Sequence, residues 1–108
     1  EFFIKKVSEI LKDSKDEIDT SKIYINDKFI GPGYAKYRKE DIELYLDIAR
    51  KTGILFDPCY TGKAFAGFIS NIENKYDKKG NHLFIHTGGM FGWTKEMREM
   101  AKEIVREK

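Results

Sequence analysis

The sequence is poor in cysteine and proline, and it has no long hydrophobic run. Its 108 residues include one cysteine and two prolines. A single cysteine cannot form an internal disulfide, which favours a reducing, cytoplasmic environment. No apolar run reaches the roughly 20 residues that a membrane-spanning helix needs, and no signal peptide is evident. These absences argue against a secreted disulfide-linked protein and against a membrane protein.

Neither sign of charge dominates the sequence. Twenty basic and 18 acidic residues leave a net charge of +2. The signs are interspersed, whereas nucleic-acid-binding proteins typically carry a basic stripe. We therefore expect no nucleic-acid partner, and we interpret the Lys/Glu runs as solvated helix faces. With 41% hydrophobic and 35% charged residues, the composition indicates one small globular domain.

Apolar residues at helical spacing predict four helices. They are expected over residues 2–12, over 39–51, from Thr61 onward, and as a C-terminal helix at 91–108. Gly53 stands where a glycine commonly ends a helix. The Thr61 hydroxyl can cap the third helix by accepting a hydrogen bond from a free backbone N–H.

Short apolar runs between these helices predict strands. "KIYINDKFI" is expected to form a hairpin around Asn26 and Asp27, and "ILF" at 54–56 and "HLFIH" at 82–86 are expected to be single strands. "DSKDEIDTSK" at 13–22 is a predicted loop, and "GPGY" at 31–34 and "DKKGN" at 77–81 are predicted turns. Strands that alternate with helices predict an α/β fold with a partial, open, mainly parallel sheet flanked by helices. Two or three strands are few for a complete domain of this class.

The segments that follow two predicted strands are candidate binding elements. In open α/β sheets, ligands bind beyond the carboxyl ends of the strands. Thr87-Gly88-Gly89 follows the strand at 82–86, and residues 57–61 follow the strand at 54–56 and open a helix, whose free N–H groups favour an anion. The alternative is an ordinary tight turn and a helix cap. From spacing alone, that alternative is the preferred interpretation.

No metal site is expected from the cysteine and the histidines. His82 and His86 are four residues apart on a predicted strand, which places them about 13 Å apart, too far to share one ion. Cys59 is therefore interpreted as an ordinary buried cysteine. The sequence also contains no Gly-rich dinucleotide fingerprint, no phosphate-binding Walker loop and no nucleophile elbow.

Three longer motifs together resemble one family. They are "GPGYA" at 31–35, "GILFDPCYTGKAFAGFI" at 53–69 and "LFIHTGG" at 83–89. They resemble the C-terminal part of the D-cysteine desulfhydrase and 1-aminocyclopropane-1-carboxylate deaminase family, which are pyridoxal 5'-phosphate (PLP) enzymes with the tryptophan-synthase-β-like fold, fold type II. The resemblance covers roughly residues 23–90, with the motifs in the family's order and at similar intervals.

The resemblance implies roles for five residues. Tyr60 would stand beside the cofactor ring near the substrate α-carbon, and Tyr34 would line the substrate pocket, so both are predicted catalytic residues. Thr87 would contact the pyridine nitrogen, with Gly88 beside it, and Thr61 would lie beside the ring. These three are the predicted cofactor-binding residues.

The two threonines also point to one branch of the family. Deaminases of 1-aminocyclopropane-1-carboxylate typically carry glutamate and leucine where this chain has Thr61 and Thr87. The resemblance therefore implies D-cysteine desulfhydrase-like α,β-elimination of a small amino acid to pyruvate, ammonia and sulfide. Two alternatives stay open: 1-aminocyclopropane-1-carboxylate deaminase activity, and a non-catalytic α/β fragment that binds an anionic ligand or a partner.

The sequence departs from the family's pattern at two places. Ala35 stands where the family usually has glycine. Nothing matches the family's cofactor-binding lysine or its phosphate-binding loop, and Lys63 is not assigned that lysine's role. We therefore expect residues 1–108 to be a single C-terminal segment of a longer enzyme, inactive and unable to bind PLP alone. Its expected partners are the N-terminal part of the same protein and, because family members are commonly dimers, a second copy.

Overall fold

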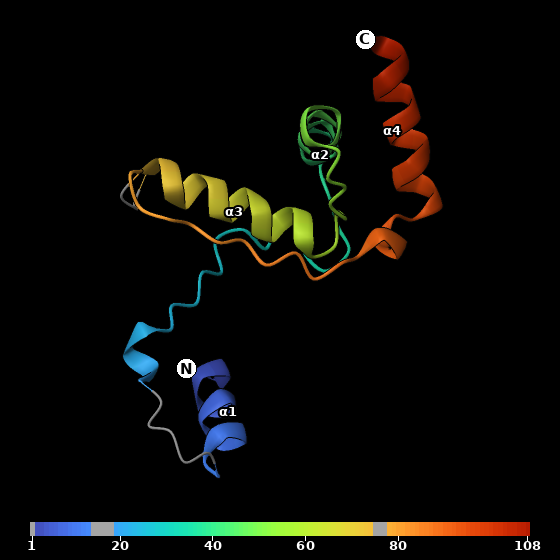
Figure 1. The fold of residues 1–108 in the computed structure, drawn as a ribbon. Coiled ribbons are helices and arrows are strands. Elements are labelled where there is room, and N and C mark those ends of the chain that lie inside the picture. The colour runs from blue at the N-terminus through green and yellow to red at the C-terminus, as the bar shows by residue number, and fades with distance from the viewer. Residues whose placement is uncertain (1, 14–18, 75–77) are drawn as a thin grey trace.

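The computed structural model describes residues 2–13, 19–74 and 78–108 (Figure 1). Its elements, in chain order, are α1 (Phe2–Leu11), η1 (Thr20–Lys22), α2 (Lys39–Thr52), α3 (Thr61–Asn74), η2 (Met90–Gly92) and α4 (Lys95–Glu107). Helices α2, α3 and α4 form the main body, and α1 lies apart from it. The radius of gyration is 16.8 Å, compared with about 13 Å for a compact domain of about 100 residues. The chain is therefore expanded.

The predicted α/β sheet is wrong, because no strand occurs among the residues that the structure describes. The segments at 54–56 and 82–86 pass close to one another without forming a backbone ladder. They are joined instead by a side chain, since His86 Nε2 lies 3.1 Å from the Leu55 carbonyl oxygen. A strand requires backbone hydrogen bonds to a neighbouring strand, so these segments are irregular connections between helices.

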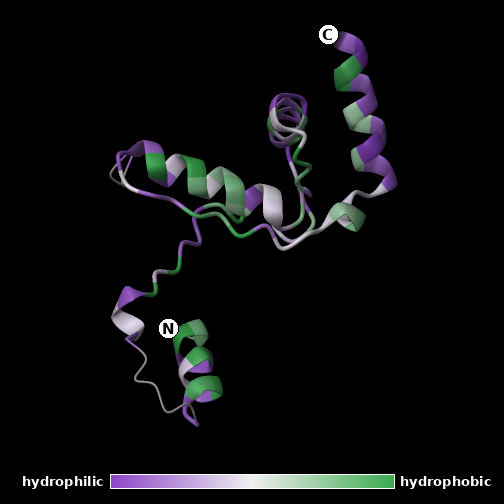
Figure 2. Ribbon diagram, viewed as in Figure 1, coloured by the Kyte–Doolittle hydropathy of each residue, from purple (hydrophilic) through white to green (hydrophobic). Residues whose placement is uncertain are grey.

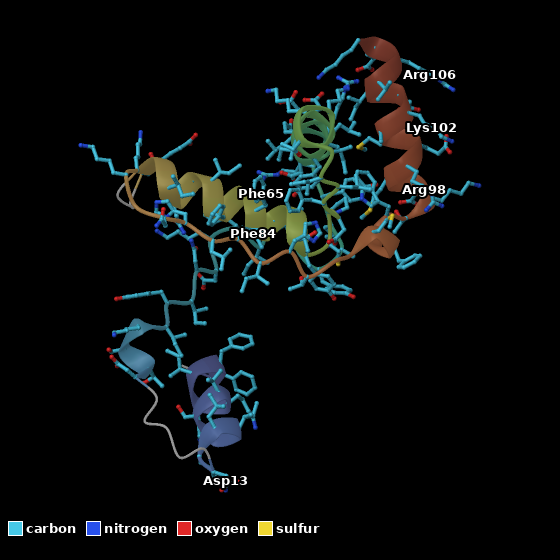
Figure 3. All side chains as sticks on the ribbon, in the orientation of Figure 1. Asp13, Phe65, Phe84, Arg98, Lys102 and Arg106 are labelled. Carbon is cyan, nitrogen blue, oxygen red and sulfur yellow. The ribbon has the colours of Figure 1, made fainter. Side chains whose placement is uncertain are left out.

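Exposed and half-buried side chains nevertheless alternate at 83–85, as they would in a strand with one packed face. Leu83 and Ile85 are 84% and 73% exposed, whereas Phe84 between them is half-buried. The Phe84 ring packs edge-on against Phe65 of α3 and against Phe56, with centroids 5.1 and 5.7 Å apart. Figure 3 shows Phe65 and Phe84 side by side between α3 and the segment that runs beneath it. One face of this segment is therefore packed and the other faces solvent.

The predicted hairpin around Asn26 and Asp27 is also wrong. The side-chain oxygen of Asn26 accepts the Lys28 N–H at 3.0 Å, so a side chain closes the turn that a backbone pair would close in a hairpin. The following residue, Phe29, lies against α3, because a Cβ added at Gly67 would be 3.0 Å from the Phe29 ring. The segment is thus held by α3 and not by a partner strand.

The four helices themselves are confirmed. Gly53 ends α2 with a φ of +76°, and its N–H donates to the Ala49 carbonyl at 2.8 Å. Helix α4 is shorter than the predicted 91–108 segment, because Thr94 caps it by accepting the Met97 N–H at 3.3 Å. Gly53 is the end signal that the sequence predicted, whereas the cap at Thr94 was not predicted.

The core lies between α2 and α4. The indole N–H of Trp93 donates to the Phe56 carbonyl at 2.9 Å, and Lys39 pairs with Glu107 at 3.2 Å across the two helices. This core positions the segment that leads into α3. Its buried apolar members are Ile42, Tyr45, Phe56, Trp93, Met97 and Ile104.

Apolar side chains of α1 lie outside this core. Figure 2 shows hydrophobic residues on α1, away from the main body, and Phe3 and Ile10 are exposed. Within the described part of the chain, no helix is both long and apolar enough to cross a bilayer. Of the predicted loop at 13–22, residues 14–18 lie outside the described residues, as does Asp77 of the predicted turn, whose residues 78–80 do form a turn.

Candidate functional site

A buried carboxylate organises the N-terminus of α3. Asp57 is 1% exposed, and its two oxygens accept the backbone N–H groups of Cys59, Tyr60 and Thr61 at 2.9, 2.8 and 3.0 Å. The Thr61 hydroxyl also donates to it, while accepting the Asp57 N–H at 3.0 Å. The free N–H groups that begin a helix are thus satisfied by one aspartate. The predicted Thr61 cap is therefore corrected to Asp57.

These contacts set the charge of Asp57. Burial alone acts to raise its pKa, because a charged carboxylate loses hydration. The hydrogen bonds from the Thr61 hydroxyl and from the three backbone N–H groups stabilise the charged form and outweigh burial. The pKa of Asp57 is consequently lowered, so the group is a carboxylate at neutral pH and a fixed negative charge at the helix N-terminus.

The predicted binding loop that follows residue 86 packs on the same carboxylate. Gly89 has a φ of +102°, and a Cβ added there would overlap Asp57 Oδ2. A Cβ added at Gly92 would lie 3.0 Å from Asp57 Oδ1. The segment at 57–61 and the glycine loop at 87–92 therefore meet at Asp57, although the sequence analysis preferred an ordinary turn and a helix cap at these places.

Tyr34 and Tyr60, the two predicted catalytic residues, are brought together. The Tyr60 hydroxyl donates to the Tyr34 hydroxyl at 3.1 Å. Their rings meet edge-on with centroids 5.9 Å apart, and both side chains are exposed. Two residues 26 positions apart in the sequence thus present adjacent hydroxyl groups on one surface.

The tyrosine pair borders a surface pocket of about 360 Å³. Cys59 and Lys63 contribute to its wall from the start of α3, and Phe29 contributes from the segment that packs on α3. Cys59 is a half-buried free thiol. The pocket is bordered mainly by apolar surface with two phenol groups at its rim, a combination typical of small-ligand sites.

The hydrogen bond between the phenols affects the acidity of Tyr60. It stabilises the neutral donor, and partial desolvation acts in the same direction, so the pKa of Tyr60 is raised to about 12. Tyr60 is therefore a neutral phenol at physiological pH. A neutral phenol donates hydrogen bonds, and it is not a general base.

The turn that carries Tyr34 is held against α3 by a lysine. Lys63 Nζ donates to the Gly33 carbonyl at 2.8 Å. The backbone of this turn is unusual, because Ala35 has a φ of +53°, a conformation that residues with a Cβ rarely adopt. The glycine that the family usually has at this position would adopt it without that cost.

The three predicted cofactor-binding residues differ in accessibility. Thr87 is exposed, and nothing lies within 4 Å of a Cβ added at Gly88, so the backbone is open on that side. Thr61 is 4% exposed, and its hydroxyl is engaged with Asp57. The hydroxyl of Thr87 is available to a ligand, whereas that of Thr61 is committed to the helix N-terminus.

Sequence reasoning did not assign a role to Asp57 or Lys63. A signal for Asp57 was available, because aspartate is a favoured capping residue and proline is favoured just after a cap, and Pro58 follows Asp57. No local signal marks the contact from Lys63 to Gly33, since it joins residues 30 positions apart. Among the described residues, no group of three His, Cys, Asp or Glu side chains could hold a metal ion.

Comparison with known proteins assigns the family. A Thermotoga maritima protein named "Putative 1-aminocyclopropane-1-carboxylate deaminase" is 36% identical to this chain over 104 residues. The chain belongs to the 1-aminocyclopropane-1-carboxylate deaminase and D-cysteine desulfhydrase family. The match covers 94% of this chain and 32% of the relative, so the chain spans about a third of that protein's length. No family model and no solved structure matches the chain.

Enzymes of this family use PLP, and the predicted site residues differ in what they offer such a group. The Thr87 hydroxyl is exposed and the backbone at Gly88 is open, but neither residue borders the pocket of Tyr34 and Tyr60. Thr61 does not offer its hydroxyl. Lys63 does not offer a free amine, because its ammonium donates to Gly33.

Proposed function

We propose that the whole protein is a PLP-dependent lyase that performs α,β-elimination on a small amino acid, as D-cysteine desulfhydrases do. The products would be pyruvate, ammonia and sulfide. The observation that carries the proposal is the pair of hydroxyls of Tyr34 and Tyr60, 3.1 Å apart at the rim of a pocket. The motifs around these tyrosines are those that resemble the family, and the family assignment supports PLP chemistry.

PLP, when bound, would withdraw electrons from the substrate α-carbon and so make the elimination possible. The chain's own residues would orient the substrate. In the pair, Tyr60 donates its proton to Tyr34 Oη, which leaves the Tyr34 proton available to a substrate group in the pocket. Because Tyr60 stays neutral up to about pH 12, its role would be hydrogen-bond donation and not proton abstraction. Thr87 would contact the cofactor from the glycine loop.

A second candidate is deamination of 1-aminocyclopropane-1-carboxylate. The name of the Thermotoga maritima relative favours it. The threonines at 61 and 87 favour elimination, because deaminases of this family typically carry glutamate and leucine there. The buried position of Thr61 favours a small residue as well, since a glutamate side chain in that place would have to share the site of the Asp57 carboxylate.

The test is to assay the whole protein for sulfide from D-cysteine and for ammonia from 1-aminocyclopropane-1-carboxylate. We expect sulfide release, and we expect Tyr60→Phe to lower its rate by about 10²- to 10³-fold through loss of a positioned hydrogen-bond donor, while PLP stays bound, as read from the cofactor's absorbance. Tyr24→Phe is the matched control, because Tyr24 is exposed and does not border the pocket. Ammonia without sulfide would select the deaminase, and turnover of neither substrate would remove both candidates.

A further inference from the structure

The side chain of Lys63 joins two parts of the site. Its ammonium donates to the Gly33 carbonyl at 2.8 Å, and Gly33 immediately precedes Tyr34. On the other side, Lys63 follows Tyr60 by three residues, and the Tyr60 carbonyl accepts the Ala64 N–H at 3.0 Å as in a helical turn. Residues three apart on a helix lie on the same face. One hydrogen bond thus ties the backbone before Tyr34 to the turn of α3 after Tyr60.

The turn at 31–35 depends on such a tie because its backbone is unfavourable. Gly31 and Gly33 have φ values of +71° and +135°, and Ala35 has +53°. Glycine gives up the most conformational freedom on ordering, and an alanine in the left-handed region is strained because its Cβ crowds the backbone. Within the turn, the Lys36 N–H donates to the Gly33 carbonyl at 3.1 Å. That one internal bond offsets only part of this cost.

Lys63 also packs along the turn. A Cβ added at Gly31 would lie 3.4 Å from Lys63 Cε, so the aliphatic stem covers Gly31 while the ammonium reaches Gly33, two residues further along. This arrangement leaves little freedom to the lysine.

We propose that Lys63 is a positioning residue whose hydrogen bond to the Gly33 carbonyl keeps the Tyr34 hydroxyl within hydrogen-bonding distance of the Tyr60 hydroxyl. The importance of this pair for catalysis rests on the proposed function, but the positioning itself does not. If the tie is removed, the turn at 31–35 loses its attachment to α3 and the distance between the two hydroxyls is no longer defined.

The experiment compares four variants of the whole protein. Lys63→Met removes the ammonium and keeps much of the stem, Lys63→Gln is a second replacement in case the first does not fold, and Lys63→Arg keeps a cationic donor. Lys51→Met is the matched control, since Lys51 is an exposed lysine paired with Asp47 on α2. The readouts are folding by circular dichroism, kcat and KM for elimination, and Tyr60 ionisation by NMR of tyrosine labelled at the ring carbon bearing the hydroxyl.

We expect Lys63→Met to lower kcat by about 10- to 100-fold, with little change in KM. We also expect it to shift the pKa of Tyr60 from about 12 toward the ordinary value of about 10. Lys63→Arg should keep kcat and the pKa of Tyr60 closer to those of the unmodified protein, and Lys51→Met should change neither quantity. Unchanged Tyr60 ionisation in folded Lys63→Met or Lys63→Gln overturns the positioning role, even if kcat falls. If the unmodified protein shows no elimination, the proposed function fails, and Tyr60 ionisation alone still decides the role of Lys63.

Discussion

At the N-terminus of α3, the Asp57 carboxylate accepts three backbone N–H groups and the Thr61 hydroxyl. Sequence reasoning assigned the cap to Thr61, because threonine is a good capping residue and stands at the start of the apolar pattern. In the structure, Thr61 is the first residue of α3 and lies four residues after Asp57. A carboxylate with two oxygens can satisfy more donors than one hydroxyl can, and Asp57 therefore takes the cap.

This arrangement predicts that Asp57→Ala destabilises the whole protein. The substitution leaves three N–H groups without their acceptor, and we expect a loss of about 2 kcal/mol in the free energy of unfolding. Urea denaturation at neutral pH measures the change. Asp27→Ala is the control, since Asp27 is exposed, and it should alter the unfolding free energy by less than about 0.5 kcal/mol.

The pH dependence of the same variant is a sharper check. The folded pKa of Asp57 is lowered, whereas the unfolded value is about 3.9. The stability that its charge contributes is thus present above about pH 4 and is lost as the pH falls through the folded pKa. The difference in unfolding free energy between the unmodified protein and Asp57→Ala should therefore become smaller below about pH 4. A difference that stays constant as the pH falls below about 4 would show that the charge of Asp57 does not contribute to stability.

The contact between Tyr34 and Tyr60 could not be predicted from the sequence. Six tyrosines are present, and the resemblance to the family gave roles to Tyr34 and Tyr60 among them. Their contact depends on the turn at 31–35 folding back onto α3. Nothing in the local sequence pattern specifies how the turn attaches to α3, because the attachment joins the Gly33 carbonyl to Lys63, 30 residues further along the chain.

At the scale of elements, the helices were predictable and the strands were not. Helices α2 and α4 carry apolar residues at helical spacing, and their end signals at Gly53 and Thr94 are local. The segments at 54–56 and 82–86 have the composition of strands and even the alternation. A strand also needs a partner, which is a non-local condition that alternation cannot test.

The loop at 87–89 gives a prediction at this scale, because two adjacent glycines share a conformation and differ in surroundings. Gly88 and Gly89 have φ values of +96° and +102°, but only at Gly89 would a Cβ overlap Asp57. We expect Gly88→Ala to cost about 1–2 kcal/mol from backbone strain and Gly89→Ala to cost about 1–3 kcal/mol more.

Thermal unfolding of the two variants in the whole protein measures the difference. Equal losses would mean that the loop moves away from Asp57 without cost, and the contact between the two segments would then not matter for stability. A smaller loss for Gly89→Ala than for Gly88→Ala would contradict the packing described here.

The whole molecule is an open arrangement of helices. Figure 3 shows Arg98, Lys102 and Arg106 along α4, directed away from the core. Elsewhere large apolar groups are in solvent, including Leu83 and the fully exposed Phe91. Exposed apolar surface of this kind marks contact surfaces with other segments or chains, in keeping with a chain that spans about a third of its relative's length.

The isolated chain should therefore not bind PLP covalently at one site. After incubation with PLP and reduction with borohydride, peptide mass analysis should find no single stoichiometric lysine adduct, because Lys63 is engaged with Gly33. The whole protein is the positive control and should give one adduct, on a lysine outside these 108 residues. A stoichiometric adduct on Lys63 of the isolated chain would refute both the assignment of its ammonium and the expected inactivity.

The sequence by itself determined the four helices, the C-terminal end of α2 and the family, because periodicity, the glycine at a helix end and long motifs are all features of neighbouring positions. The tertiary structure decided that the extended segments have no strand partner, that Asp57 caps α3 and supports the glycine loop, and that Lys63 draws Tyr34 to Tyr60. These features depend on contacts between residues far apart in the chain. Such contacts arise only when α3, the turn at 31–35 and the loop at 87–92 pack together.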